Sequence, residues 1–216
     1  MEKIEAVIFD LDGTLVNSIE DIGNSVNHAL VAYGLSQLKP ELFSEIVGWG
    51  LEFLVQRAVE LVNGDGSLVL EVTRLAIEIY EKNPVEKTFI YPGILELVQA
   101  IKSSGRQLAV LTNKRARIAR RVVHTLFGEG YFEVIYGEEP GKPRKPQPEA
   151  AWELCAQLGV PPNQCLMVGD SKVDVQLAHA AGMPVVGVSW GFRGVEELHQ
   201  AQAIVQDPQE IIKLLN

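Results

Sequence analysis

"AVIFDLDGTLVNS", residues 6–18, begins as an apolar run and continues into a segment with two carboxylates, Asp10 and Asp12. The run predicts a strand over residues 3–9 that is apolar on both faces at its end, a pattern typical of a parallel sheet covered by helices on each side. Side chains two residues apart in an extended chain point the same way, so Asp10 and Asp12 should face one space while Leu11 turns to the other. We therefore expect a charged site where this buried strand ends.

Short apolar runs recur along the rest of the chain and alternate with segments of helical periodicity. The further strands expected are residues 107–112, 132–137, 164–170, 184–189 and a less apolar run at 203–206. The helices expected between and after them are about 93–104, 114–127, 147–158, 172–181 and 208–215. This alternation predicts an α/β fold with a doubly wound, mainly parallel sheet, that is, a Rossmann-like core.

Residues 19–83 interrupt the alternation, because they contain no convincing strand. Their periodicity predicts three helical segments, at about 19–33, 40–63 and 67–82. Pro84 and the "YPG" that follows mark the return of the chain to the strand and helix alternation. We expect a helical cap at 19–83 inserted into an α/β catalytic core made of residues 1–18 and 84–216.

Charge and composition limit the classes of partner. The chain has 216 residues, enough to bury a sizeable core, with 47% hydrophobic and 22% charged residues. Its net charge of -9 argues against a nucleic-acid partner, since proteins that bind phosphate backbones usually carry basic surfaces. A small phosphorylated metabolite remains possible as substrate if local positive charge or a metal ion offsets the acidic field.

Other features favour a protein of the reducing cytoplasm without a membrane partner. The first residues resemble neither a signal peptide nor a transit sequence, and no apolar run approaches the roughly 20 residues of a membrane span. Cys155 and Cys165 are the only cysteines, and they lack CxxC spacing or a neighbouring histidine cluster. A disulfide framework or a structural zinc site is therefore not expected.

Polar side chains follow several of the expected strands. Thr112 and Asn113 end the second strand, whereas Asp170 ends the fourth and Asp174 follows it. After the third strand, "GKPRKPQP" should bring three cations to the same edge: Lys142, Arg144 and Lys145. Ligands of open parallel sheets bind outside the carboxyl ends of the strands. Carboxylates, a hydroxyl and an amine should therefore converge there.

These groups fit phosphoryl transfer, which requires a positioned nucleophile and positive charge around the phosphoryl oxygens. Two carboxylates in one pocket repel unless a cation lies between them or one is protonated, and oxygen ligands favour Mg2+, with Asp170 supplying a third oxygen. Asp10 can attack phosphorus as a nucleophile, and Asp12 can act as general acid and then general base. Thr112 and Lys145 would hold the phosphoryl oxygens.

Four segments, "DLDGTLVNS", "LTNK", "KPQP" and "GDSKVD", resemble the ordered motifs of the haloacid-dehalogenase-like superfamily of phosphohydrolases. The resemblance implies Asp10 as nucleophile, Asp12 as acid and base, and Thr112, Asn113 and Lys145 as substrate-binding residues. It also implies Mg2+ bound by the Asp10 carboxylate, the Asp12 main-chain carbonyl and Asp170, with Asp174 in support. Related sequences usually carry Asp where this chain has Asn17.

Within that superfamily, "IVGWGLEFLVQRAV" at 46–59 is similar to the capped subgroup that includes phosphoglycolate phosphatase, which points to 2-phosphoglycolate as substrate. Two alternatives stay open. A phosphomutase, or a phosphatase of a sugar phosphate, would use the same nucleophile. A non-catalytic phospho-receiver module also combines acids, Thr and Lys, although its phosphorylated Asp ends a later strand and it has no cap.

Several of these residues also have purely structural interpretations. Thr112 and Asn113 alone favour a helix N-cap before a helix that starts at Lys114. That helix begins with a cluster of basic residues, which favours a solvated face: Lys114, Arg115, Arg117, Arg120 and Arg121. The alternative is that Lys114 and Arg115, nearest the strand end, attract an anionic substrate. Asp174 can stabilise a helix N-terminus. In the cap, Trp49, Phe53 and Leu54 favour helix packing over substrate contact.

Overall fold

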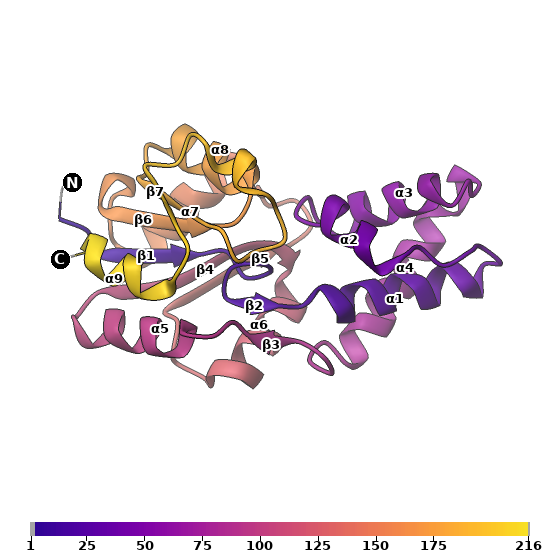
Figure 1. The fold of residues 1–216 in the computed structure, drawn as a ribbon, viewed down its shortest axis with the longest axis horizontal. Helices are drawn as coiled ribbons and strands as arrows, with labels where there is room; N and C mark the ends of the chain where they lie inside the picture. Colours follow the sequence, from indigo (N-terminus) through magenta and orange to yellow (C-terminus); the bar gives the residue numbers. More distant parts are fainter. Residues whose placement is uncertain (1–2, 216) are drawn as a thin grey trace.

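The computed structural model describes residues 3–215, and within that range six strands form one parallel sheet (Figure 1). The strand order is β5-β4-β1-β6-β7-β8. The strands are β1 (Ala6–Phe9), β4 (Gln107–Arg115), β5 (Val134–Glu138), β6 (Cys165–Gly169), β7 (Val185–Val188) and β8 (Ala203–Val205). The chain builds outward from β1 in one direction through β4 and β5, then in the other through β6, β7 and β8. The predicted doubly wound sheet is confirmed.

Helices cover both faces of the sheet (Figure 1). One face carries α5 (Ile94–Ser103), α6 (Ala116–Phe127) and α9 (Pro208–Leu215), and the other carries α7 (Pro148–Leu158) and α8 (Lys172–Ala181). Val7 and Phe9 pack into the first layer, while Ala6 and Ile8 pack into the second. This alternation explains why β1 is apolar throughout, since both of its faces are buried. None of the helices in residues 3–215 is long and apolar enough to cross a membrane.

A helical insert lies beside the carboxyl end of the sheet, at the opposite end of the molecule from α9 (Figure 1). It contains α1 (Ile19–Ala32), α2 (Pro40–Ile46), α3 (Leu51–Leu61) and α4 (Val69–Lys82). The prediction of one helix over 40–63 is wrong. Val47 is extended, and Gly48 and Gly50 have positive φ angles of 114° and 90°, a conformation that glycine adopts readily and that ends one helix before the next begins.

A short antiparallel ribbon, which the sequence pattern did not predict, joins the insert to the core. It pairs β2 (Val16–Asn17) with β3 (Phe89–Ile90). The Asn17 side chain accepts a hydrogen bond from the Ile19 backbone N–H at 3.3 Å. Asp21 in α1 accepts backbone N–H groups from residues 86–88 at 2.8 to 3.1 Å. These bonds hold together the two chain segments that connect the insert to the core.

Strand β4 continues further than its apolar sequence indicates. The predicted N-cap at Thr112 and Asn113 is wrong, because β4 extends to Arg115 and α6 begins at Ala116. The pairing of β4 with β5 shifts register between Leu111 and Arg115. A polar but buried segment therefore stays extended, which points its side chains into the region between the sheet and the insert instead of along a helix.

Candidate active site

A pocket lies between the carboxyl ends of the strands and the helical insert. The core contributes Asp10, Asp12, Thr112, Asn113, Asp170 and Phe192, and the insert contributes Gly48, Leu54 and Tyr80. Five of the predicted site residues thus line one pocket. The other two, Lys145 and Asp174, lie behind the Asp10 carboxylate and contact it or each other.

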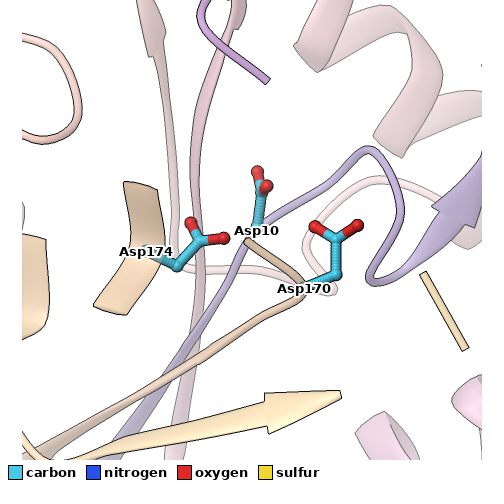
Figure 2. Close-up of side chains that lie close together, drawn as sticks. All are labelled: Asp10, Asp170 and Asp174. Carbon is cyan, nitrogen blue, oxygen red and sulfur yellow. The ribbon is translucent and has the colours of Figure 1, made fainter. Parts of the chain in front are cut away.

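Three buried carboxylates gather at the floor of this pocket. Asp10 follows β1, Asp170 follows β6 and Asp174 lies in the first turn of α8, with Asp10 between the other two (Figure 2). One oxygen from each lies within 4.8 Å of the others. Glycines make room for Asp170: a Cβ on Gly13 would lie 2.3 Å from its Oδ2, and one on Gly191 would lie 2.3 Å from its Cβ. The close approach of these turns sets the position of Asp170.

Lys145 supplies the positive charge within this cluster. Its Nζ lies 2.8 Å from Asp10 Oδ1 and 2.7 Å from Asp174 Oδ1, and its side chain is 2% exposed. Burial disfavours the ammonium, but the attraction of Asp10 and then of Asp174 outweighs burial and raises the pKa of Lys145 above its usual value. Lys145 therefore stays charged in the site.

The other two cations of the same loop do not join it. Instead, each pairs with a glutamate nearby: Lys142 with Glu139 at 2.7 Å and Arg144 with Glu138 at 3.2 Å. Arg144 does reach the edge of the pocket, because a Cβ on the pocket residue Gly50 would lie 3.0 Å from its Nη1. Asp174 has the helix-start role that its position predicts, since its Oδ2 accepts the Ser171 hydroxyl at 2.7 Å in a capping box.

The acid cluster fits a hard divalent cation. Burial is the main cause that raises the pKa of Asp10 from 3.8 to about 7, with Lys145 opposing and Asp174 adding to the shift. Burial, and then the charges of Asp10 and Asp174, raise the pKa of Asp170 well above 3.8. The single positive charge of Lys145 therefore does not balance the negative charges of the three carboxylates. Asp174 is already bound by Lys145 and Ser171, so Asp10 and Asp170 are the carboxylates with oxygens left for an ion such as Mg2+.

Asp12 contacts a different cation, Lys114. The predicted solvated position is wrong for Lys114, whose Nζ lies 2.6 Å from Asp12 Oδ1 and also donates to Tyr80 Oη at 2.6 Å. Burial opposes its charge, but Asp12 and then Tyr80 outweigh burial and raise the pKa of Lys114 above its usual value. Arg117 and Arg120 in α6 do carry exposed side chains, as expected. Sequence reasoning missed Tyr80, because nothing in its helical spacing distinguishes it from a packing residue.

Thr112 and Asn113 are buried on the extended end of β4. The Thr112 hydroxyl accepts the Lys114 backbone N–H at 3.2 Å. Asn113 Nδ2 donates to the backbone oxygens of Gly48 at 3.1 Å and of Lys145 at 3.0 Å, which joins the insert to the core. Among residues 3–215, the buried Asn113 Oδ1 has no hydrogen-bond partner. Both residues are thus positioned by the sheet and line the pocket.

The insert rests on the core around the segment between α2 and α3. Arg193, in the loop after β7, donates Nη1 to the Glu45 oxygen at 2.6 Å and Nη2 to the Val47 oxygen at 2.5 Å. Trp49 and Phe53 contact each other with ring centroids 6.2 Å apart, but Phe53 is exposed. Leu54 packs into the hydrophobic core, as expected, and also lines the pocket. The pocket is thus closed on one side by backbone and apolar groups of the insert.

Comparisons with known proteins agree with this geometry. A sequence model of the family described as "Haloacid dehalogenase-like hydrolase" matches residues 7–188. A phosphoglycolate phosphatase of Haemophilus influenzae is 36% identical over 196 residues, 88% of each protein. One from Chromobacterium violaceum is 33% identical over 201 residues, 92% of this chain and 90% of that protein.

Solved structures extend the likeness to the whole fold. The crystal structure described as a "predicted phosphoglycolate phosphatase" from Haemophilus somnus 129PT matches with a TM-score of 0.92 and 30% identity, covering 100% of both chains. The family resemblance and the expectation of an enzyme are confirmed. The chain belongs to the haloacid dehalogenase-like hydrolase family.

Proposed function

We propose that the protein is a Mg2+-dependent phosphatase of small phosphate monoesters, with 2-phosphoglycolate as its preferred substrate. The observation that carries the proposal is Asp10, a buried carboxylate at the end of the central strand that contacts Lys145 and faces Asp170 beneath a pocket. The names of the relatives that are 33% to 36% identical to this chain support the choice of substrate.

In this proposal Asp10 is the nucleophile. One carboxylate oxygen attacks phosphorus, the bond from phosphorus to the ester oxygen breaks, and Asp12 gives its proton to the leaving alcohol. A water molecule then attacks the aspartyl phosphate while Asp12 takes a proton from it, which releases phosphate and restores Asp10. Mg2+ held by Asp10 and Asp170 would offset negative charge between the nucleophile and the phosphoryl group.

Other residues of the chain would orient the phosphoryl group. Lys145 holds Asp10 from one side and carries a fixed positive charge, and Thr112 offers a hydroxyl at the neighbouring strand end. Asn113 ties the Lys145 loop and the insert together and leaves its buried Oδ1 as an acceptor. Asp174 supports Lys145 and is assigned no direct contact with the substrate.

Residues 19–83 would act as a cap that closes over Asp10 and excludes bulk water during the attack. The short ribbon of β2 and β3, which brackets the insert, supports boundaries near these residues. The proposed location is the cytoplasm. Two free, buried thiols, Cys155 and Cys165, with sulfur atoms 3.6 Å apart, are compatible with a reducing compartment.

Phosphate release from a panel of esters, with Mg2+ or with EDTA, tests this function. We expect 2-phosphoglycolate to give the highest kcat/KM, EDTA to abolish turnover, and Asp10→Asn to lower kcat by at least about 1000-fold. The exposed Asp65→Asn is the matched control and should retain activity. Near wild-type release by Asp10→Asn would refute the mechanism. Movement of phosphate within a sugar phosphate, without release, would replace the phosphatase with a mutase.

A further inference from the structure

A chain of three side chains crosses from the core to the insert at the pocket. It consists of Asp12 after β1, Lys114 on the extended end of β4 and Tyr80 in α4. Lys114 Nζ donates to Asp12 Oδ1 and to Tyr80 Oη, both at 2.6 Å, and lies 4.7 Å from the centroid of the Tyr80 ring. The side chain of Lys114 is 3% exposed, so bulk water does not replace these partners. The insert therefore contacts Asp12 through one buried ammonium.

The two oxygens of Asp12 have different surroundings. Oδ1 accepts both the Ser18 hydroxyl, at 2.5 Å, and Lys114 Nζ. Within residues 3–215, no donor is found on Oδ2. Two bonds to one oxygen fix the orientation of the carboxylate and leave the other oxygen available for proton transfer.

The Tyr80 side chain is buried, like the Lys114 side chain that donates to its hydroxyl. The residue is 3% exposed and belongs to a helix that packs against α1 and α3 within the insert. Its hydroxyl reaches Lys114 only while α4 lies against the end of β4, because Tyr80 and Lys114 belong to the two different parts of the protein. Any movement of the insert away from the core would therefore remove one of the two bonds that hold Lys114.

We propose that Lys114 and Tyr80 are positioning residues for the proton transfer by Asp12, and that Tyr80 makes this positioning depend on closure of the insert. The proposal rests on the proposed function, in which Asp12 donates a proton as the ester bond breaks. In the closed protein, Tyr80 holds Lys114, Lys114 holds Oδ1 of Asp12, and Oδ2 gives its proton to the leaving oxygen. Asp12 is thus oriented for acid catalysis only when the substrate is enclosed.

Substrates that differ in their need for a proton separate this role from a structural one. Phosphoglycolate and ethyl phosphate release alcohols, whose oxygen must be protonated as the bond breaks. Acetyl phosphate is of similar size but releases acetate, which leaves without a proton. We would measure kcat/KM, which reports on the steps up to release of the leaving group, for wild type, Lys114→Met, Tyr80→Phe and the double variant.

A loss of acid catalysis removes about 100-fold or more in rate. We expect Lys114→Met to lower kcat/KM for both alkyl phosphates by about 100-fold and for acetyl phosphate by less than about 10-fold. Tyr80→Phe should lower kcat/KM for the two alkyl phosphates by about 10-fold. The kcat/KM of the double variant should be no lower than that of Lys114→Met, because both residues act through the same contact with Asp12. Lys102 and Tyr131 form a similar pair outside the pocket, with Lys102 Nζ 5.2 Å from the centroid of the Tyr131 ring. Lys102→Met and Tyr131→Phe are therefore matched controls, and their kcat/KM values should equal those of wild type.

Two results would overturn the inference. Equal losses on all three substrates would give Lys114 a general structural role. A rise in KM for phosphoglycolate alone, with ethyl phosphate unaffected, would make Lys114 a ligand of the substrate carboxylate. If wild type hydrolyses ethyl and acetyl phosphate but not phosphoglycolate, the proposed substrate fails, and the comparison of the other two still decides the role of Lys114.

Discussion

Replacing the proposed nucleophile should make the metal-free protein more stable. Asp10 is buried in a cluster of three acids that one ammonium, Lys145, compensates. Asp10→Asn removes one negative charge and keeps an oxygen that can accept the Leu11 backbone N–H, as Oδ1 does at 2.6 Å. We therefore predict that in EDTA at pH 8 this variant unfolds at a higher temperature than wild type.

The expected size follows from the ionisation of Asp10. Burial raises the pKa of Asp10 from 3.8 to about 7 in the folded protein, despite opposition by Lys145. Between these pH values the folded state binds a proton that the unfolded state has lost, so the free energy of unfolding falls as pH rises through this window. A shift of about 3 units corresponds to about 4 kcal/mol, and because Asp170 shares the repulsion we expect a gain of about 2 kcal/mol in the variant.

Thermal unfolding followed by fluorescence or calorimetry measures this gain. For a chain of this size, about 2 kcal/mol corresponds to a rise in Tm of about 4 to 8 °C. At pH 4 the difference should shrink, because wild-type Asp10 is then protonated and uncharged in the folded protein. Mg2+ at about 100 times its Kd should stabilise wild type by about 3 kcal/mol and the variant by much less, which would reverse the order of their melting temperatures.

A matched control is Asp21→Asn. Asp21 is also buried, but its carboxylate accepts three backbone N–H groups and the Thr88 hydroxyl, so loss of its charge should lower the Tm at pH 8. If Asp10→Asn instead lowers the Tm in EDTA at pH 8, or if its effect does not change between pH 4 and pH 8, the reasoning about the uncompensated acid cluster is refuted.

Three other substitutions test the arrangement around this cluster. Lys145→Met leaves its buried acids unpaired and should lower the free energy of unfolding in EDTA by about 3 to 5 kcal/mol, measured by urea denaturation, with part of the loss recovered in Mg2+. Gly13→Ala places a Cβ 2.3 Å from Asp170 Oδ2 at a φ of +89°, so we expect weaker Mg2+ binding by calorimetry and a loss of about 1 to 3 kcal/mol in stability. Arg193→Gln removes two bonds to the insert and should raise KM by about 10-fold with little change in kcat; an unchanged KM would mean that these bonds do not hold the insert closed.

The strand ends could be predicted because parallel topology brings them together whatever the details of packing. Once β1 is recognised as a buried parallel strand, Asp10 must lie at the same edge of the sheet as Thr112, near the carboxyl end of β4, and Asp170, which follows β6. The capping role of Asp174 was also predictable, since it depends only on the local spacing from the N-cap Ser171 to Asp174, three residues later, just after a strand. Local sequence thus accounts for the fold class and for the acid cluster.

The pairing of each cation with its acid depends on tertiary contacts. The helix predicted over residues 114–127 would place Lys114 on a solvated face, but the pairing of β4 with β5 keeps that residue in an extended strand, where it is buried against Asp12. Lys114 meets Tyr80 because the insert folds back over a site 34 residues further along the chain. Such contacts depend on strand register and on the placement of the insert, and neither produces a periodic pattern in the sequence. A shift of one residue in strand pairing reverses the direction of a side chain without any change in the neighbouring sequence.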